Sequence, residues 1–310
     1  MEFVVQMLLL VVGFLMLIKG ADWFVDGAAG IAEKFGIPHL VVGLTIVAMG
    51  TSAPEAAVSL TAALKGNAAI TIGNVVGSNI LNVLIILGLT AAVTAVPVAA
   101  STVKIEIPFT ILVTVLLGIF GYTGNCISFQ EGVFLWIIFV GYLAYLFWMT
   151  LKDKDENEIE KEKKPVWKLL LFTLVGVALI IFGSDVTVNA TTAIATLFGM
   201  SQRFIGLTIV ALGTSLPELV TSVSAARKGE ADIAIGNIVG SNLFNILFVV
   251  GTTALITPVV FEAAFLIDTV IAAAVVVLLW TCVFRRRVLS RMAGVIMLAG
   301  YAVYFVYLIR

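Results

Sequence analysis

The sequence predicts an all-α polytopic membrane protein whose ten transmembrane helices form two inverted five-helix repeats. The composition, the number of long apolar segments and an internal repeat together predict this fold. Of the 310 residues, 61% are hydrophobic and only 12% are charged, and the mean hydropathy is +1.14. A soluble domain carries about 25% charged residues. An apolar chain with a net charge of −1 is therefore not a soluble enzyme, a disordered protein or a nucleic-acid-binding protein.

Ten segments are long and apolar enough to span a bilayer, because a transmembrane helix needs about 20 mostly apolar residues. They are 3–29, 38–64, 69–93, 105–124, 128–151, 167–190, 201–227, 232–256, 261–284 and 291–310. The first is too long, and too polar at its end, to be a cleaved signal peptide. The mixed charges of 152–166 predict a solvated linker, which separates a first five-helix repeat (1–151) from a second (167–310).

The basic residues predict the orientation of the chain, because cytoplasmic loops carry an excess of Lys and Arg. Six lysines in or beside the linker and eight further basic residues fall on one side of the membrane. Only Lys65, Arg203 and Arg310 fall on the other side. Both termini are therefore predicted to lie outside and the charged linker in the cytoplasm. With no targeting segment or appended domain in the sequence, we expect a multi-pass protein of a prokaryotic plasma (inner) membrane.

An internal repeat relates the two halves of the chain. Residues 20–88 align without a gap to residues 183–251 at a constant offset of 163, and 35 of the 69 positions are identical. Because each copy begins a half with an odd number of spans, the second half enters the membrane from the opposite side. The two copies are then related by a pseudo-two-fold axis in the membrane plane and meet near its centre, an arrangement typical of secondary transporters.

The first repeated block, GTSxPE, places a glutamate in the second and seventh predicted spans, at Glu55 and Glu218. A central acidic residue costs about 2.5–3.5 kcal/mol on insertion scales and needs a partner or a function. The motif-bearing spans carry no Lys or Arg near their centres, so the remaining partners are a bound cation or a bound proton. Pro54 and Pro217 bend these spans and free the carbonyls of Gly50 and Gly213.

The second repeated block places a polar stripe on each following span. Asparagine, serine and asparagine recur at intervals of four residues, at Asn74, Ser78 and Asn82 and again at Asn237, Ser241 and Asn245. Together the blocks offer carboxylate, hydroxyl, amide and backbone oxygens, without sulfur or imidazole. Oxygen ligands suit hard cations such as Ca²⁺, whereas soft metals prefer nitrogen or sulfur. Because competing ions would share the same carboxylates, occupancy by one excludes the other, which is the physical basis of exchange.

Two copies of GTSxPE, each followed about 20 residues later by GNxxGSNxxN, resemble the alpha-repeats of sodium/calcium exchangers, within the cation/calcium antiporter superfamily. The resemblance covers the whole chain. It implies coupled exchange of Na⁺ for Ca²⁺ by alternating access, with the first and sixth spans sliding against the other eight. It further implies no enzymatic activity and no cofactor, with Ca²⁺ and Na⁺ as transported ions in a lipid bilayer and no obligate protein partner.

The resemblance also implies a role for each motif residue. Ca²⁺ would be held by the two glutamates with two threonines, namely Glu55, Glu218, Thr51 and Thr214. Sodium sites would use the same glutamates with four serines and two backbone carbonyls, namely Ser52, Ser215, Ser78, Ser241 and the carbonyls near Ala48 and Ala211. Asn82 and Asn245 would line the centre between them.

Several alternatives stay open at this point. Some relatives carry an aspartate where this chain has Asn82 or Asn245, so stoichiometry, K⁺ dependence and the coupling ion are not fixed, and an H⁺/Ca²⁺ antiporter is the nearest alternative. The GTSxPE form favours sodium. A passive channel is a further alternative, whereas an intramembrane protease lacks its motifs. Asp22 and Asp185, equivalent under the repeat, are expected to be interfacial residues at membrane edges, and the alternative is that they lie at the mouth of a cation path. Four other acids are expected to be solvated: Glu106, Glu131, Glu262 and Asp268.

Overall fold

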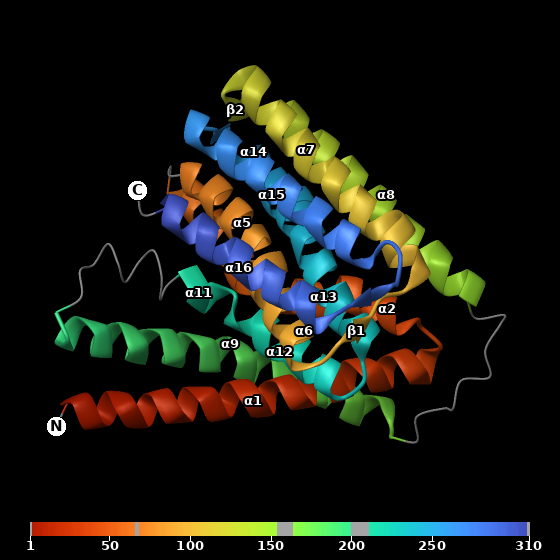
Figure 1. Cartoon of the computed structure of the whole chain (residues 1–310), viewed down its shortest axis with the longest axis vertical. Helices are drawn as coiled ribbons and strands as arrows, with labels where there is room; N and C mark the ends of the chain where they lie inside the picture. Colours follow the sequence, from red (N-terminus) through yellow and green to blue (C-terminus); the bar gives the residue numbers. More distant parts are fainter. Residues whose placement is uncertain (1, 66–67, 154–163, 200–210, 309–310) are drawn as a thin grey trace.

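A computed structural model describes residues 2–65, 68–153, 164–199 and 211–308. Within these ranges, eight helices are long and apolar enough to cross a membrane, and the helix pair His39–Thr51 and Ala53–Leu64 forms one further span bent by 50°. The predicted span 201–227 is described only from residue 211 onward, and Arg203 lies outside the described residues. The predicted all-α membrane fold is confirmed (Figure 1). The spans found in the described residues are roughly consistent with the predicted ten.

The helices of the first half follow the predicted spans closely, with short π-helical segments (η) inside several of them. They are α1 (Glu2–Phe35), α2 (His39–Val42), η1 (Gly43–Val47), α3 (Ala48–Thr51), α4 (Ala53–Leu64), α5 (Ala69–Leu81), η2 (Asn82–Leu87), α6 (Gly88–Val93), η3 (Thr102–Glu106), α7 (Ile107–Gly124) and α8 (Phe129–Asp153). Two short strands, β1 (Val96–Pro97) and β2 (Cys126–Ile127), lie between them.

The described residues of the second half follow a similar order after the linker. Its helices are α9 (Val166–Leu197), α11 (Ala211–Thr214), α12 (Leu216–Arg227), α13 (Ala231–Phe244), η5 (Asn245–Val250), α14 (Gly251–Ile256), α15 (Ala263–Val283) and α16 (Arg291–Leu308). Its strands are β3 (Val259–Val260) and β4 (Val288–Leu289). β1 pairs antiparallel with β4 and β2 with β3, so each ribbon joins one repeat to the other.

The helices α1 and α9 lie side by side and run obliquely to the rest of the bundle (Figure 1). Glycines let their backbones approach, since a methyl group at Gly20 would lie 2.9 Å from the Gly176 carbonyl oxygen. A methyl group at Gly183 would lie 3.0 Å from the Gly13 carbonyl oxygen. These contacts are equivalent under the repeat, and small residues of this kind are the usual basis of close helix packing in membranes.

The centre of the molecule is formed by the helices that carry the second repeated block. In the most apolar stretch of Ala231–Ile256, 94% of the residues are buried, compared with 17% in α1. The bent span packs directly on α13, because methyl groups at Gly236 and Gly240 would lie 3.0 Å from the Leu40 carbonyl oxygen and 2.7 Å from the Leu44 carbonyl oxygen. The two motifs of different repeats are therefore in contact.

Two features differ from the sequence predictions. The first and sixth helices are longer than the predicted spans, because α1 continues to Phe35 and α9 to Leu197. The placement of Asp22 and Asp185 at membrane edges stays a prediction. The prediction that Glu106 is solvated is wrong. Its side chain is fully buried and accepts a hydrogen bond from the Tyr145 hydroxyl at 2.6 Å. The position of Glu106 near the end of a predicted span does not reveal that α8 packs over its side chain.

Candidate cation site

Both motif glutamates lie at breaks in the middle of their spans. The backbone leaves helical geometry at Ser52 (φ −81°, ψ 8°) and at Ser215 (φ −92°, ψ 4°). Proline two residues later explains each break, since it has no N–H and its ring clashes with the carbonyl of the residue four positions earlier. Glu55 and Glu218 then fall in the first turn of α4 and α12, where the positive end of the helix dipole favours a carboxylate.

Each glutamate is bonded to a serine of the other repeat. The Ser52 hydroxyl donates to Glu218 Oε1 at 2.7 Å, and the Ser215 hydroxyl donates to Glu55 Oε1 at 3.4 Å. Both carboxylates are only 1% exposed, and neither forms an ion pair with a basic residue in the part of the chain that the structure describes. Each buried carboxylate is therefore bonded to the other repeat, and within the described ranges no basic side chain neutralises it.

Asn74 and Asn237 brace the broken helices. The Asn74 amide donates to the Glu55 carbonyl at 3.1 Å and to Ser59 Oγ at 2.9 Å. The Asn237 amide makes the equivalent bonds to the Glu218 carbonyl at 3.3 Å and to Ser222 Oγ at 2.9 Å. These asparagines therefore fix the first turns of α4 and α12 through the backbone, which places the two carboxylates.

Two asparagines that the sequence analysis did not single out connect the repeats. The side-chain amide of Asn79 donates to the backbone carbonyl of Asn242 at 3.1 Å, and the side-chain amide of Asn242 donates to the backbone carbonyl of Asn79 at 3.3 Å. The Asn242 side-chain oxygen accepts from the Asn82 amide at 2.9 Å, and the Asn79 side-chain oxygen accepts from the Asn245 amide at 3.1 Å. The sequence does contain a signal for them, because Asn79 follows Ser78 and Asn242 follows Ser241 in the two GSN triplets. These two asparagines lie outside the polar stripe whose residues are spaced by four.

Among the predicted site residues, four buried oxygens have no hydrogen-bond partner in the described part of the chain. They are two carboxylate oxygens and two amide oxygens, Glu55 Oε2, Glu218 Oε2, Asn82 Oδ1 and Asn245 Oδ1. Leaving such acceptors unpaired away from water is costly. The four belong to two pairs related by the offset of 163, so the repeat places identical acceptors on both sides of the axis.

The other predicted site residues lie on the same two motifs. Thr51 is fully buried and donates to Asn237 Oδ1 at 2.9 Å, and Ser241 donates to the Ala48 carbonyl at 3.4 Å. Ser78 is buried on α5, and Thr214, which is half-buried, ends α11. Ala211 begins α11 directly after residues 200–210, which lie outside the described residues.

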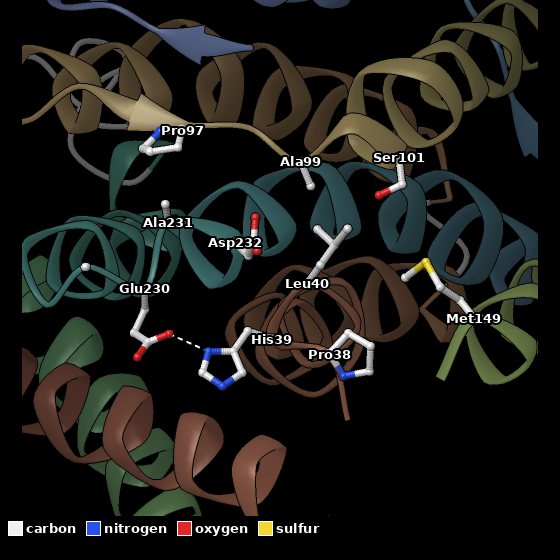
Figure 2. Close-up of a pocket in the computed structure, with 11 residues that line it drawn as sticks. Pro38, His39, Leu40, Pro97, Ala99, Ser101, Met149, Glu230, Ala231 and Asp232 are labelled. Atoms are coloured by element: carbon white, nitrogen blue, oxygen red, sulfur yellow. Dashed lines mark hydrogen bonds and ion pairs between the residues drawn. The ribbon is translucent and has the colours of Figure 1, made fainter. Parts of the chain in front are cut away.

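A separate cavity of about 520 Å³ lies where α2 and α13 begin (Figure 2). His39 Nδ1 and Glu230 Oε2 approach to 2.5 Å there, which links the first residue of α2 to the residue preceding α13. None of the predicted site residues lines this cavity. Nowhere in the described ranges do three His, Cys, Asp or Glu side chains gather as a metal centre would require. The candidate site instead combines two carboxylates with neutral oxygens.

Comparison with known proteins decides the family. A profile described as "Sodium/calcium exchanger protein" matches residues 5–148 and 168–310. The chain belongs to the sodium/calcium exchanger protein family. The resemblance inferred from the motifs is thereby confirmed, and family membership supports antiport of a cation against Ca²⁺ by a membrane transporter rather than an enzyme.

Individual relatives of the exchanger family agree over nearly the whole chain. The sodium/calcium exchanger MaX1 of Methanosarcina acetivorans is 32% identical and the alignment covers 98% of each chain. A putative antiporter, CaxA of Alkalimonas amylolytica, is 43% identical over 84% of this chain and 83% of its own length. A solved structure of the sodium-calcium exchanger NCX_Mj superimposes with a TM-score of 0.85 at 29% identity, covering 98% of this chain and 99% of that one.

Proposed function

We propose that this protein is a Na⁺/Ca²⁺ antiporter that binds its cations between Glu55 and Glu218. The observation that carries the proposal is the set of four buried, unpartnered oxygens at the axis between the repeats. Two of the four belong to carboxylates, and two negative charges match one divalent or two monovalent cations. Ca²⁺ takes six to eight oxygen ligands, and the neighbouring hydroxyls and backbone carbonyls of the same motifs supply the remainder.

Exchange follows from sharing these carboxylates. In the proposed assignment Ca²⁺ contacts the two glutamates with Thr51 and Thr214. Na⁺ ions contact the same glutamates with four serines and two carbonyls, namely Ser52, Ser215, Ser78, Ser241 and the carbonyls of Ala48 and Ala211. Either ion set neutralises the two carboxylates, so the sets exclude one another. Asn82 and Asn245 line the centre, held there by Asn79 and Asn242.

Alternating access requires one part of the molecule to move relative to the site. The close backbone packing of Gly20 on Gly176 and of Gly183 on Gly13 supports α1 and α9 as a single moving unit. In our proposal this unit slides over the two broken spans and exposes the site first to one side and then to the other. The distribution of basic residues supports an orientation in a prokaryotic inner membrane with both termini outside and the charged linker on the cytoplasmic side.

The test is ⁴⁵Ca²⁺ uptake by proteoliposomes that are loaded with Na⁺ and diluted into Na⁺-free buffer. A parallel set carries an outward proton gradient and contains no sodium. We expect uptake only with the sodium gradient. Uptake driven only by protons would assign the chain to H⁺/Ca²⁺ antiport instead. Flux that never proceeds against the Ca²⁺ gradient would indicate a channel.

A further inference from the structure

A group of charged and polar side chains ties α1 to the end of α12. The Lys228 ammonium donates to Asp26 Oδ1 at 2.7 Å and to the Asp22 backbone carbonyl at 2.8 Å. Its nitrogen also lies 3.6 Å from Asp22 Oδ1, and that same oxygen accepts a hydrogen bond from Ser224 at 2.9 Å. We call these four residues the clamp. They join the proposed moving unit to a helix that carries a site glutamate.

The internal repeat places an equivalent set of residues at the opposite end of the molecule. Shifting the clamp by 163 positions gives Asp185, Asn189, Thr61 and Lys65. Lys65 and Asp185 are exposed, and neither forms an ion pair with any residue that the structure describes. The second carboxylate of the clamp, Asp26, is replaced by the neutral Asn189. The clamp is therefore formed at one end only, and its counterpart has one charge fewer.

We propose that Asp22, Asp26, Ser224 and Lys228 form a clamp that keeps one side of the transporter closed and biases the access equilibrium toward the state open on the other side. This inference rests on the proposed alternating access. When α1 and α9 slide, the clamp opens and Lys65 reaches Asp185 at the opposite end. By the distribution of basic residues, the clamped side is the cytoplasmic one, because α12 ends there at Arg227 and Lys228.

The size of the bias follows from the exposure of the charges. The side chains of Lys228, Asp22 and Asp26 are 28%, 39% and 47% exposed, so solvent screens each ion pair. Exposed pairs contribute little individually, although a network contributes more. The extra carboxylate of the clamp is expected to shift the ratio of the two access states by about threefold to tenfold. Ion binding can reverse a shift of this size, because the reversal requires only a modest difference between the ion's affinities for the two access states.

The experiment uses a matched pair of variants, Lys228→Gln and Lys65→Gln, in the full chain. Each variant removes one equivalent lysine, but from opposite ends. In nanodiscs, spin labels on Phe35→Cys and Arg227→Cys, with Cys126 and Cys282 replaced by Ser, report the distance between the ends of α1 and α12. We expect Lys228→Gln to enlarge the long-distance population about fivefold and Lys65→Gln to reduce it. This readout needs no transport, so it stands even where the coupling ion differs from Na⁺.

Transport gives a second readout. In oriented proteoliposomes, Lys228→Gln should lower the apparent KM for Ca²⁺ on the clamped side and raise it on the other, because apparent affinity scales with the population of the competent state. Asp26→Asn and Asn189→Asp should both shift the ratio in the same direction as Lys228→Gln, and their effects should add. The proposal is overturned where both lysine variants match the unsubstituted protein, or where both change the ratio of affinities in the same direction.

Discussion

The centre of the molecule and its two ends follow the internal repeat to different degrees. At the centre, each serine–glutamate and asparagine–asparagine bond named above has its counterpart 163 residues away, down to the unpartnered oxygens. Away from these bonds the symmetry breaks: in the clamp Asp26 corresponds to Asn189, and beside the helix break Ser184 corresponds to Ala21. A site that is reached from both sides of a membrane therefore needs equivalent ligands in both repeats. The surfaces that close the site at each end can differ in their residues.

The largest expected effect tests the symmetry of the centre. Glu55→Gln and Glu218→Gln should each lower Ca²⁺ flux by about 150-fold to 5,000-fold, because removing one charge from a buried ionic set costs about 3–5 kcal/mol. The measurement is ⁴⁵Ca²⁺ uptake under a sodium gradient, with Glu262→Gln as the control, since Glu262 is exposed and lies away from the site. Full retention of flux by either glutamate variant would contradict the proposed site.

The asparagines that bridge the repeats should give the next largest effect. Asn79→Ala removes the acceptor of the Asn245 amide and the donor to the Asn242 carbonyl. Each buried group left unsatisfied costs about 1–3 kcal/mol, so we expect Ca²⁺ affinity to fall by about 10-fold to 100-fold. Asn242→Ala should behave alike. Isothermal titration with Ca²⁺ measures both, and a clear inequality between the two variants would show that the central symmetry is not functional.

The central motifs were predictable from the sequence, because a glutamate or a proline in the middle of a transmembrane helix is costly and is rarely present for packing alone. The breaks at Ser52 and Ser215 and the burial of both glutamates follow from these residue types alone. The roles of Asn79 and Asn242 were not predictable, since they depend on which helix of the other repeat lies opposite. An interval of four residues identifies one face of a helix, and these two asparagines act from the next face.

The burial of Glu106 and the contacts of the clamp could not be predicted from the sequence either. Both depend on packing between helices that are distant in the chain, as with Tyr145 over Glu106 and Lys228 beside Asp26. The first apolar segment was expected to end near residue 29, yet α1 continues to Phe35. Hydropathy locates the part of a helix inside lipid and does not show where the helix itself ends.

The glycine contacts between α1 and α9 provide a smaller test of the comparison. Gly20→Ala and Gly183→Ala each place a methyl group about 3 Å or less from backbone atoms of the facing helix. Overpacking of this kind typically costs about 1–3 kcal/mol. We expect a lower unfolding temperature and slower exchange for both, measured by thermal unfolding in detergent and by ⁴⁵Ca²⁺ uptake. Gly141→Ala is the control, because a methyl group there meets nothing within 4 Å.

The smallest expected effect concerns a bond that only one repeat can make. The Ser184 hydroxyl on α9 donates at 2.7 Å to the carbonyl of Gly213, one of the two carbonyls that the prolines free, whereas Ala21 has no hydroxyl to offer Gly50. Ser184→Ala should therefore lower stability by about 0.5–1.5 kcal/mol, measured by thermal unfolding in detergent. Ala21→Ser places a hydroxyl at the equivalent position and should not destabilise. Equal losses in both variants would mean that this bond does not distinguish the repeats, and the asymmetry would then rest on the charged residues alone.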